Sequence, residues 1–171
     1  QRFAELGNRG VLALMSDSTN ADRPGFTMSE RKVGESFEKL FVQAEGRRII
    51  IATFASNIHR VQQIINNAVS TGRKVAVSGR SMVNVISIGI ELGYLKVPDG
   101  VLVDIDMVSR YPADKMVIVT TGSQGEPMSA LTRMANNEHR QVSITPMDFI
   151  IISANPIPGN EKLVTRVINI A

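Results

Sequence analysis

The sequence has 171 residues, of which 43% are hydrophobic and 20% are charged, and its 19 basic and 16 acidic side chains give a net charge of +3. This length fits one globular domain, which buries enough surface to fold without a disulfide or a metal. The absence of cysteine excludes a disulfide scaffold, a cysteine zinc finger and a thiol nucleophile. No apolar stretch approaches the roughly 18 residues of a membrane span, and no leader opens the chain, so we expect a cytoplasmic protein without a membrane partner.

Five short apolar runs alternate with segments whose apolar residues recur every three or four positions. This alternation is typical of an α/β fold with three layers, in which a mostly parallel sheet is flanked by helices on both faces. Residues 98–114 fit neither pattern and are left unassigned. The predicted strands span Val11 to Met15, Arg48 to Thr53, Lys74 to Val77, Met116 to Thr120 and Phe149 to Ser153.

The predicted helices lie between and after these strands. They cover Thr27 to Ala44, Ile58 to about Gly72, Ser81 to Gly93, a segment that starts at Pro127, and a segment from Asn160 to the end. Thr27 and Glu30 have the spacing of a capping box. The last helix reaches the final residue and the first residue is Gln1 rather than methionine, so we expect a segment of a longer protein.

The turn after the second predicted strand is a candidate phosphate site. Ligands of open parallel sheets gather beyond the carboxyl ends of the strands, and a helix that begins there directs unpaired backbone amides outward. Ser56, Asn57 and Ile58 would supply these amides, and His59 and Arg60 follow on the first helical turn. The alternative is that Ser56 or Asn57 only caps the helix.

Two further turns contain polar residues. Gly122 to Glu126, which includes Ser123 and Gln124, is a loop bracketed by glycines that suits close approach of an anion, although a tight turn explains it equally well. The loop lacks the Lys-Ser/Thr ending of a P-loop, so nucleotide hydrolysis is unsupported. Arg80, beside Ser81, would bind a phosphate or pair with a surface carboxylate.

Acid-base and metal chemistry have few candidates in this chain. Asp17 ends the first predicted strand and is the best placed carboxylate; Ser18, Thr19 and Asn20 would hold it, unless the cluster is an ordinary turn. His59 and His139 are the two histidines, too few for a zinc site of three or four ligands. We therefore expect the chain to bind no metal by itself.

Six motifs, in the same order, resemble the β-CASP region of bacterial ribonuclease J and cover nearly the whole chain. They are Ser-Asp-Ser-Thr-Asn at 16–20, Thr-Met-Ser-Glu-Arg at 27–31, Thr-Phe-Ala-Ser-Asn-Ile-His-Arg at 53–60, Gly-Arg-Ser-Met at 79–82, Thr-Gly-Ser-Gln-Gly-Glu-Pro-Met at 121–128 and Pro-Ile-Pro-Gly-Asn at 156–160. Six motifs together are far more specific than any single loop.

The resemblance implies a Rossmann-like β-CASP domain over residues 21–171, with residues 1–20 at the border of a metallo-β-lactamase domain. The full-length family enzyme is a hydrolase that uses two zinc ions and acts as a 5'-to-3' exonuclease and an endonuclease in RNA processing and mRNA decay. The His-x-His-x-Asp-His zinc motif of the family is absent from this sequence. We therefore expect the isolated chain to be inactive and the metal site to lie outside it.

The resemblance also implies roles for single residues. Asp17 matches the acidic residue of the family's motif A, a catalytic position, and Ser56, Asn57 and Ile58 match a segment that contacts RNA. It places the remaining candidates near the RNA channel: His59, Arg80, Ser123, Gln124 and Glu126. The implied partners are single-stranded RNA with a 5' monophosphate, the chain's own metallo-β-lactamase domain, and further copies or a paralogue in an oligomer.

Two readings from other classes remain open. The first is a free-standing α/β enzyme that binds a nucleotide or a sugar phosphate, for which Asp17, His59 and Glu126 would be the scattered catalytic candidates. The second is a structural segment that only binds a partner. Intact motifs at 57–60 and 122–126 favour a copy of the active type.

Overall fold

The structure, a computed structural model, describes residues 2–18, 21–22 and 24–171. Gln1 and the predicted Asp17 neighbours Thr19 and Asn20 lie outside the described residues. The described chain forms a parallel five-stranded sheet in the order β3-β2-β4-β1-β5. The strands are β1 (Arg48–Ala52), β2 (Lys74–Ser78), β3 (Leu102–Val103), β4 (Met116–Thr120) and β5 (Asp148–Ile152).

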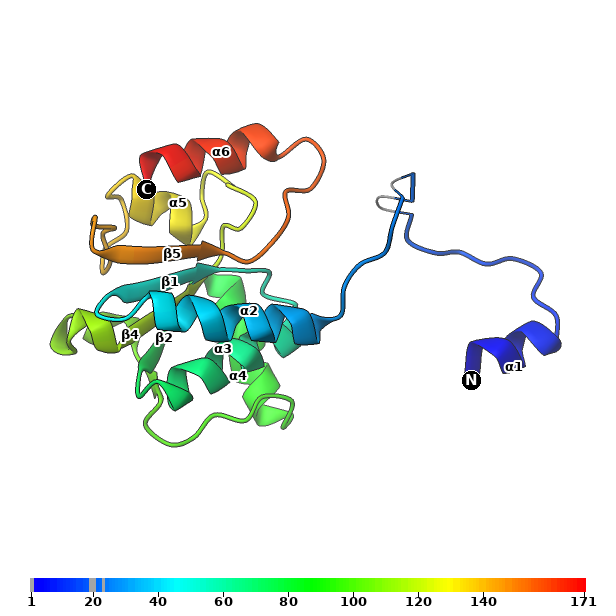
Figure 1. Cartoon of the computed structure of the whole chain (residues 1–171), viewed down its shortest axis with the longest axis horizontal. Coiled ribbons are helices and arrows are strands. Elements are labelled where there is room, and N and C mark those ends of the chain that lie inside the picture. Colours follow the sequence, from blue (N-terminus) through cyan, green and yellow to red (C-terminus); the bar gives the residue numbers. More distant parts are fainter. Residues whose placement is uncertain (1, 19–20, 23) are drawn as a thin grey trace.

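Helices cover both faces of this sheet, which confirms the predicted three-layer α/β fold (Figure 1). One face is covered by α2 (Glu30–Gln43), α3 (Ile58–Ser70) and α4 (Arg80–Glu91), and the other by α5 (Ala130–Ala135) and α6 (Glu161–Ile170). Two 3-10 turns, η1 (Ile105–Arg110) and η2 (Ala113–Lys115), connect β3 to β4. None of the described helices is long and apolar enough to cross a bilayer.

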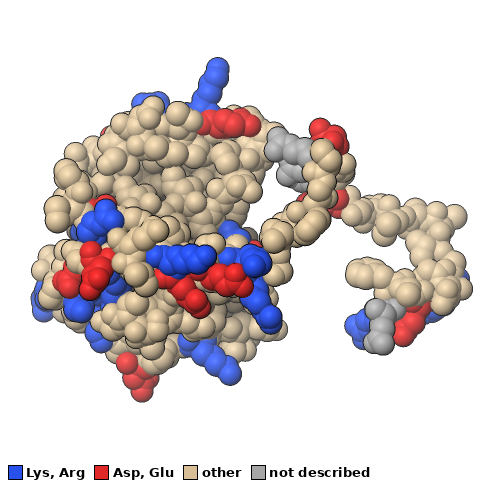
Figure 2. Space-filling view, in the orientation of Figure 1, with Lys and Arg blue, Asp and Glu red and all other residues tan. Residues whose placement is uncertain are grey.

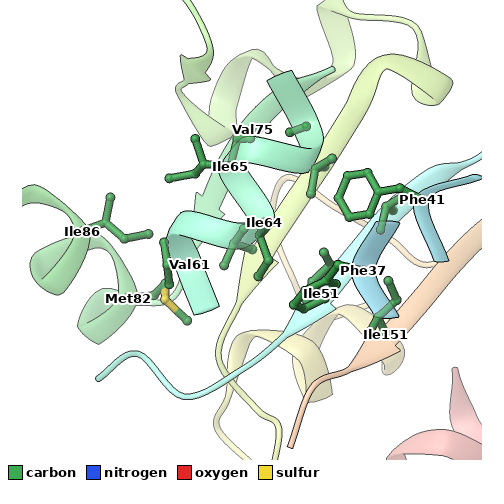
Figure 3. Packing of buried hydrophobic residues seen from close by; sticks show 14 of the residues in the cluster. Phe37, Phe41, Ile51, Val61, Ile64, Ile65, Val75, Met82, Ile86 and Ile151 are labelled. Carbon is green, nitrogen blue, oxygen red and sulfur yellow. The ribbon is translucent and has the colours of Figure 1, made fainter. Parts of the chain in front are cut away.

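The core beneath α2, α3 and α4 follows from the helical spacing of apolar residues. Phe37 and Phe41 of α2 are one turn apart and meet edge to face, with ring centroids 6.5 Å apart. Figure 3 shows these rings beside Ile51 and Ile64, with Met82 of α4 extending the same cluster. Alternate residues of β1 and β4 point to the opposite face, where they pack against Leu131 and Met134 of α5 and Val167 of α6.

The predicted strand from Val11 to Met15 is wrong. The described residues between α1 (Arg2–Asn8) and α2 form no strand and extend away from the sheet (Figure 1). Leu12 and Met15 are almost fully exposed, at 106% and 94%. Consecutive apolar residues form a buried strand only where other surfaces cover them, and the described part of this chain offers Val11 to Met15 no such cover.

The fifth strand comes instead from residues 98–114, which fit neither periodic pattern in the sequence. Leu102 and Val103 pair with Val75 and Ala76 of β2 and form the edge of the sheet. A strand of two residues has no measurable period in the sequence, which explains why the pattern did not reveal it.

Three predicted helix starts also differ from the structure. The residue before α2 is Ser29, whose side chain makes no capping hydrogen bond, so the predicted box of Thr27 and Glu30 is absent. α4 begins at Arg80 after Gly79, one residue before the expected Ser81. α5 begins at Ala130, where Ser129 Oγ accepts from the amide of Thr132 at 3.4 Å, while Pro127 lies in the preceding turn.

Gly125 allows the loop after β4 to lie directly against α6. It adopts φ = +71°, and an added Cβ would lie 2.4 Å from the carbonyl carbon of Leu163. Gly46 adopts nearly the same φ, +74°, but an added Cβ would have open space around it. Substituting each glycine in turn therefore distinguishes the cost of backbone strain, which both positions share, from the cost of close packing, which only Gly125 has.

We predict that Gly125→Ala destabilises the chain far more than Gly46→Ala. Both variants carry the strain of a positive φ, about 1 kcal/mol, but only Gly125→Ala adds overpacking of about 1–3 kcal/mol. Urea unfolding followed by circular dichroism measures both free energies of unfolding. Equal losses in the two variants would show that α6 does not lie this close to the loop.

Candidate functional site

The topology places the carboxyl ends of all strands at one edge of the sheet. β4 is central there, because its neighbours β1 and β2 continue into α3 and α4 on one face while β4 continues into α5 on the other. The connections that leave β4 and its two neighbours therefore run to opposite faces of the sheet, which opens a crevice on each side of β4. Open α/β sheets bind ligands in crevices of this kind. The predicted turns at 53–60, 78–81 and 121–127 border these two crevices.

The first crevice contains the amino end of α3. Asn57 caps this helix, since its Oδ1 accepts from the amide of Arg60 at 3.1 Å. The amides of Asn57 and Ile58 donate to carbonyl oxygens within the turn, to Phe54 and Ser56. The alternative role of Asn57 as a cap is thus confirmed, and two of the three predicted amide donors are already engaged.

Ser56 and His59 keep free donors at this helix end. Both residues are exposed, and their backbone amides donate to no described residue. The hydroxyl of Ser56 likewise has no described partner. The dipole of α3 and these unpaired backbone amides together favour binding of an anion at this helix end.

An ion pair fixes the position of this helix end. Arg60 Nη2 lies 2.6 Å from Glu30 Oε1, and Arg60 Nη1 donates to the carbonyl oxygen of Ser153 at 2.7 Å. Asn57 Nδ2 also reaches Glu30 Oε1, at 3.4 Å. These contacts join the amino ends of α2 and α3 to the end of β5, so Arg60 and Glu30 act as positioning residues.

The loop after β4 is held by Gln124, which is 3% exposed. Its Nε2 donates to the carbonyl oxygen of Asn155 at 3.0 Å, and its Oε1 accepts from the amide of Ile157 at 2.7 Å. Ser123 is buried beside it, and exposed Glu126 accepts from the amide of Gln124 at 3.2 Å. The side chain of Gln124 therefore ties two strand-to-helix loops together instead of pointing to solvent.

An open cavity of about 630 Å³ lies in the second crevice, between the ends of β2 and β4. Arg80, one of the predicted site residues, lines it. Further polar residues of its wall, none of them predicted as site residues from the sequence, are Ser78, Thr121, Arg133, His139 and Gln141.

A partly buried hydrogen bond, 2.8 Å long, joins Ser78 Oγ and His139 Nε2 in the cavity wall. His139 Nδ1 accepts from the amides of Gln141 and Val142 at 3.3 and 3.2 Å, so this nitrogen is deprotonated. The imidazole is therefore the neutral Nε2–H tautomer, and it donates to Ser78. Burial, and secondarily the charge of Arg133, lower the pKa of His139.

Asp17 is not brought to this edge. It lies on the exposed segment that runs away from the sheet (Figure 1), next to Ser16, whose Oγ donates to the Asp17 carbonyl oxygen at 3.3 Å. Among the described residues, no three His, Asp or Glu side chains come close enough together to hold a metal.

Comparison with known proteins identifies the family of this chain. Residues 46–171 match the model of the ribonuclease J β-CASP domain. The chain belongs to the ribonuclease J family. It is 53% identical over 169 residues to ribonuclease J 1 of Streptococcus pyogenes, 50% over 168 residues to ribonuclease J of Helicobacter pylori strain J99 and 44% over 168 residues to ribonuclease J2 of Bacillus subtilis.

These alignments cover 98–99% of the chain but only 24–30% of each relative. The predicted resemblance to ribonuclease J is thereby confirmed. The chain therefore spans less than a third of the length of these relatives.

Within the β-CASP domain, the structure brings most of the predicted residues to the carboxyl edge: Ser56, Asn57, Ile58, His59, Arg80, Ser123, Gln124 and Glu126. Ser78 directly follows the predicted strand Lys74 to Val77 and ends the observed β2, so its position alone could have indicated it. His139 lies 61 residues away in an irregular turn, so no spacing in the sequence connects it to Ser78.

We predict that His139 makes the stability of the domain fall in mild acid. Its lowered folded-state pKa means that the unfolded chain binds a proton first as pH falls below about 6.5, so unfolding becomes easier there. Urea midpoints at pH 7.5 and 5.5 should differ less in His139→Gln than in the unmodified chain. The matched control is His59→Gln; a flattened pH response in that variant, with His139→Gln unchanged, would contradict the assignment.

Proposed function

We propose that this chain is the RNA-holding domain of a ribonuclease J, and that residues outside it complete the hydrolytic site. Residues 21–171 would form the β-CASP domain, and residues 1–20 would border the metallo-β-lactamase domain. Identities of 44–53% to ribonucleases J over nearly the whole chain support this function over a free-standing sugar-phosphate enzyme.

The observation on which the proposal depends is the amino end of α3. The 13-residue helix α3 begins here. The amides of Ser56 and His59 and the hydroxyl of Ser56 donate to no described residue, and they lie at the carboxyl edge of the sheet. A phosphate of an RNA strand has the charge and the acceptor oxygens that these donors require. The contacts of Arg60 to Glu30 and Ser153 would keep this helix end in place as the strand binds.

The segment before α2 supports contact with another domain. Four of its large apolar side chains are 83–106% exposed: Leu12, Leu14, Met15 and Phe26. Burying such side chains is favourable by roughly 1.5–3 kcal/mol each, so their exposure indicates an interaction surface. Docking of this segment on the metallo-β-lactamase domain would also move Asp17 to the catalytic side of the protein, where its carboxylate would handle a proton.

The two zinc ions implied by the family do not fit the described residues of this chain, which hold no cluster of three metal-ligating side chains. We infer that ligands elsewhere in the full-length protein bind them. Single-stranded RNA with a 5' monophosphate, degraded from the 5' end or cut internally, remains the proposed substrate. A cytoplasmic location and an oligomer of like copies or with a paralogue complete the proposal.

We predict that Ser56→Asp weakens RNA binding by about fivefold to tenfold in low salt without destabilising the domain. A carboxylate at this helix end is compatible with the dipole but repels phosphate, and salt should reduce the effect. Fluorescence anisotropy with a labelled single-stranded RNA measures the affinity. Ser70→Asp adds the same charge about 20 Å away along α3 and serves as the control; equal affinities for both variants would remove Ser56 from the site.

We also predict that the 171-residue chain with added zinc leaves end-labelled RNA intact, while the full-length protein cleaves it under the same conditions. Gel analysis of the labelled RNA distinguishes the two. Because the expected metal ligands lie outside the chain, cleavage by the purified 171-residue chain would contradict the division of roles.

A further inference from the structure

The His139 side chain joins the turn that follows α5 to the end of β2, across the cavity of the second crevice. Its ring is half-buried in the cavity wall. Nε2 donates to Ser78 Oγ at 2.8 Å, and Nδ1 accepts from the backbone amides of Gln141 and Val142 at 3.3 and 3.2 Å. These two amides have no other acceptor among the described residues. The ring therefore fixes the turn of residues 139–142 and attaches it to the sheet.

This attachment requires the neutral ring. A protonated imidazole carries a hydrogen on both nitrogens and has no acceptor left. Nδ1–H would then face two amide N–H groups, and both amides would lose their acceptor, which costs free energy in a partly buried turn. Val142 is 2% exposed, so its amide can gain a water molecule as acceptor only after the ring has moved away.

The charges inside the cavity also disfavour a proton on the ring. Arg133 of α5 and Arg80 of α4 line the same cavity, while β2 contributes the uncharged Ser78. Burial, and secondarily the charge of Arg133, lower the pKa of His139. A protonated ring would be a third positive group in this wall, so it is more stable in water than in place.

The acidic side chains near the ring do not offset these charges. Asp106 of η1 is exposed, and its Oδ1 accepts from Gln141 Nε2 at 2.7 Å. Glu138 and Arg140, the neighbours of His139 in the chain, are exposed as well, so water screens both. None of the described carboxylates forms an ion pair with His139.

We propose that His139 is a pH-sensitive switch: the neutral ring fastens the turn of residues 139–142 to the end of β2, and the protonated ring leaves the cavity wall and releases the turn. The release is local, because the chain on both sides is held independently. The carbonyl oxygen of Arg133 accepts from the amide of Glu138 at 2.7 Å, and the Val142 side chain packs in the core beneath α5. Short turns of this kind open without unfolding the domain.

The switch would change the shape of one of the two crevices beside β4. Departure of the ring uncovers Ser78, which is otherwise 4% exposed, and widens the cavity of about 630 Å³ toward α5. The inference concerns the chain without any ligand, so it does not rest on the proposed function.

NMR spectra of the isotope-labelled 171-residue chain, recorded without RNA from pH 7.5 to pH 4.5, test the switch. The imidazole nitrogen signals report the tautomer and the protonation of His139. As the ring takes up its proton, we expect the exchange protection of the Gln141 and Val142 amides, corrected for the intrinsic pH dependence of exchange, to fall about tenfold, because each amide loses a hydrogen bond. The amides of β4 should keep their protection at the same pH.

Two variants of His139 and one control separate the switch from a merely structural role. In His139→Asn, an amide oxygen that does not titrate replaces Nδ1 as acceptor, so the two amides should stay protected throughout the pH range. His139→Ala has no acceptor, so their protection should be low at every pH. His59→Gln removes the other histidine and should leave the transition unchanged.

Amides of Gln141 and Val142 that stay protected while the ring becomes protonated would overturn the switch, and so would a transition that persists in His139→Asn. Loss of protection in β4 at the same pH would show global unfolding in place of local release. A ring that stays neutral until the sheet unfolds would contradict the proposal equally. Because no RNA is present, each of these failures leaves the proposed RNA-holding function standing, and a failed test of Ser56→Asp leaves the switch standing.

Discussion

The position of β4 is the constraint on which the rest of the structure depends. All five of its residues are buried, and it is paired in register with β1 on one side and β2 on the other. Because β1 and β2 continue into helices on one face and β4 into a helix on the opposite face, the backbone cannot close over either gap beside β4. The candidate phosphate site at α3 and the cavity between β2 and β4 are both consequences of this one reversal.

The sheet and its helices were predictable where residues of this chain cover both faces. β1, β2, β4 and β5 appeared as runs of consecutive apolar residues because the described helices pack on each side of them. The same signal failed at Val11 to Met15, where an identical pattern lies on an exposed segment. A run of apolar residues indicates that the segment needs to be buried, but it does not indicate which surface covers the segment.

The turns that form the candidate site were also predictable, whereas the tasks of their side chains were not. Gln124 and Arg60 are polar residues at the right edge, yet their side chains bind backbone carbonyls of neighbouring loops and so shape the site instead of facing a ligand. Asn57 caps a helix. Conversely, the hydrogen bond between Ser78 and His139 depends on two segments that meet only after the sheet has formed.

Charge alone would not account for the proposed RNA holding by this domain. The net charge is only +3, and Figure 2 shows basic and acidic side chains side by side over α2, so the visible face has no uniform positive field. Under the proposed function, a strand would instead be held where oriented donors lack acceptors among the described residues, at Ser56 and His59 beside the amino end of α3. Donors fixed by buried contacts recognise the repeating phosphate rather than a base, because every nucleotide presents the same oxygens. A strand held in this manner could advance one nucleotide and find the same contacts again, as the proposed stepwise degradation from one end would require.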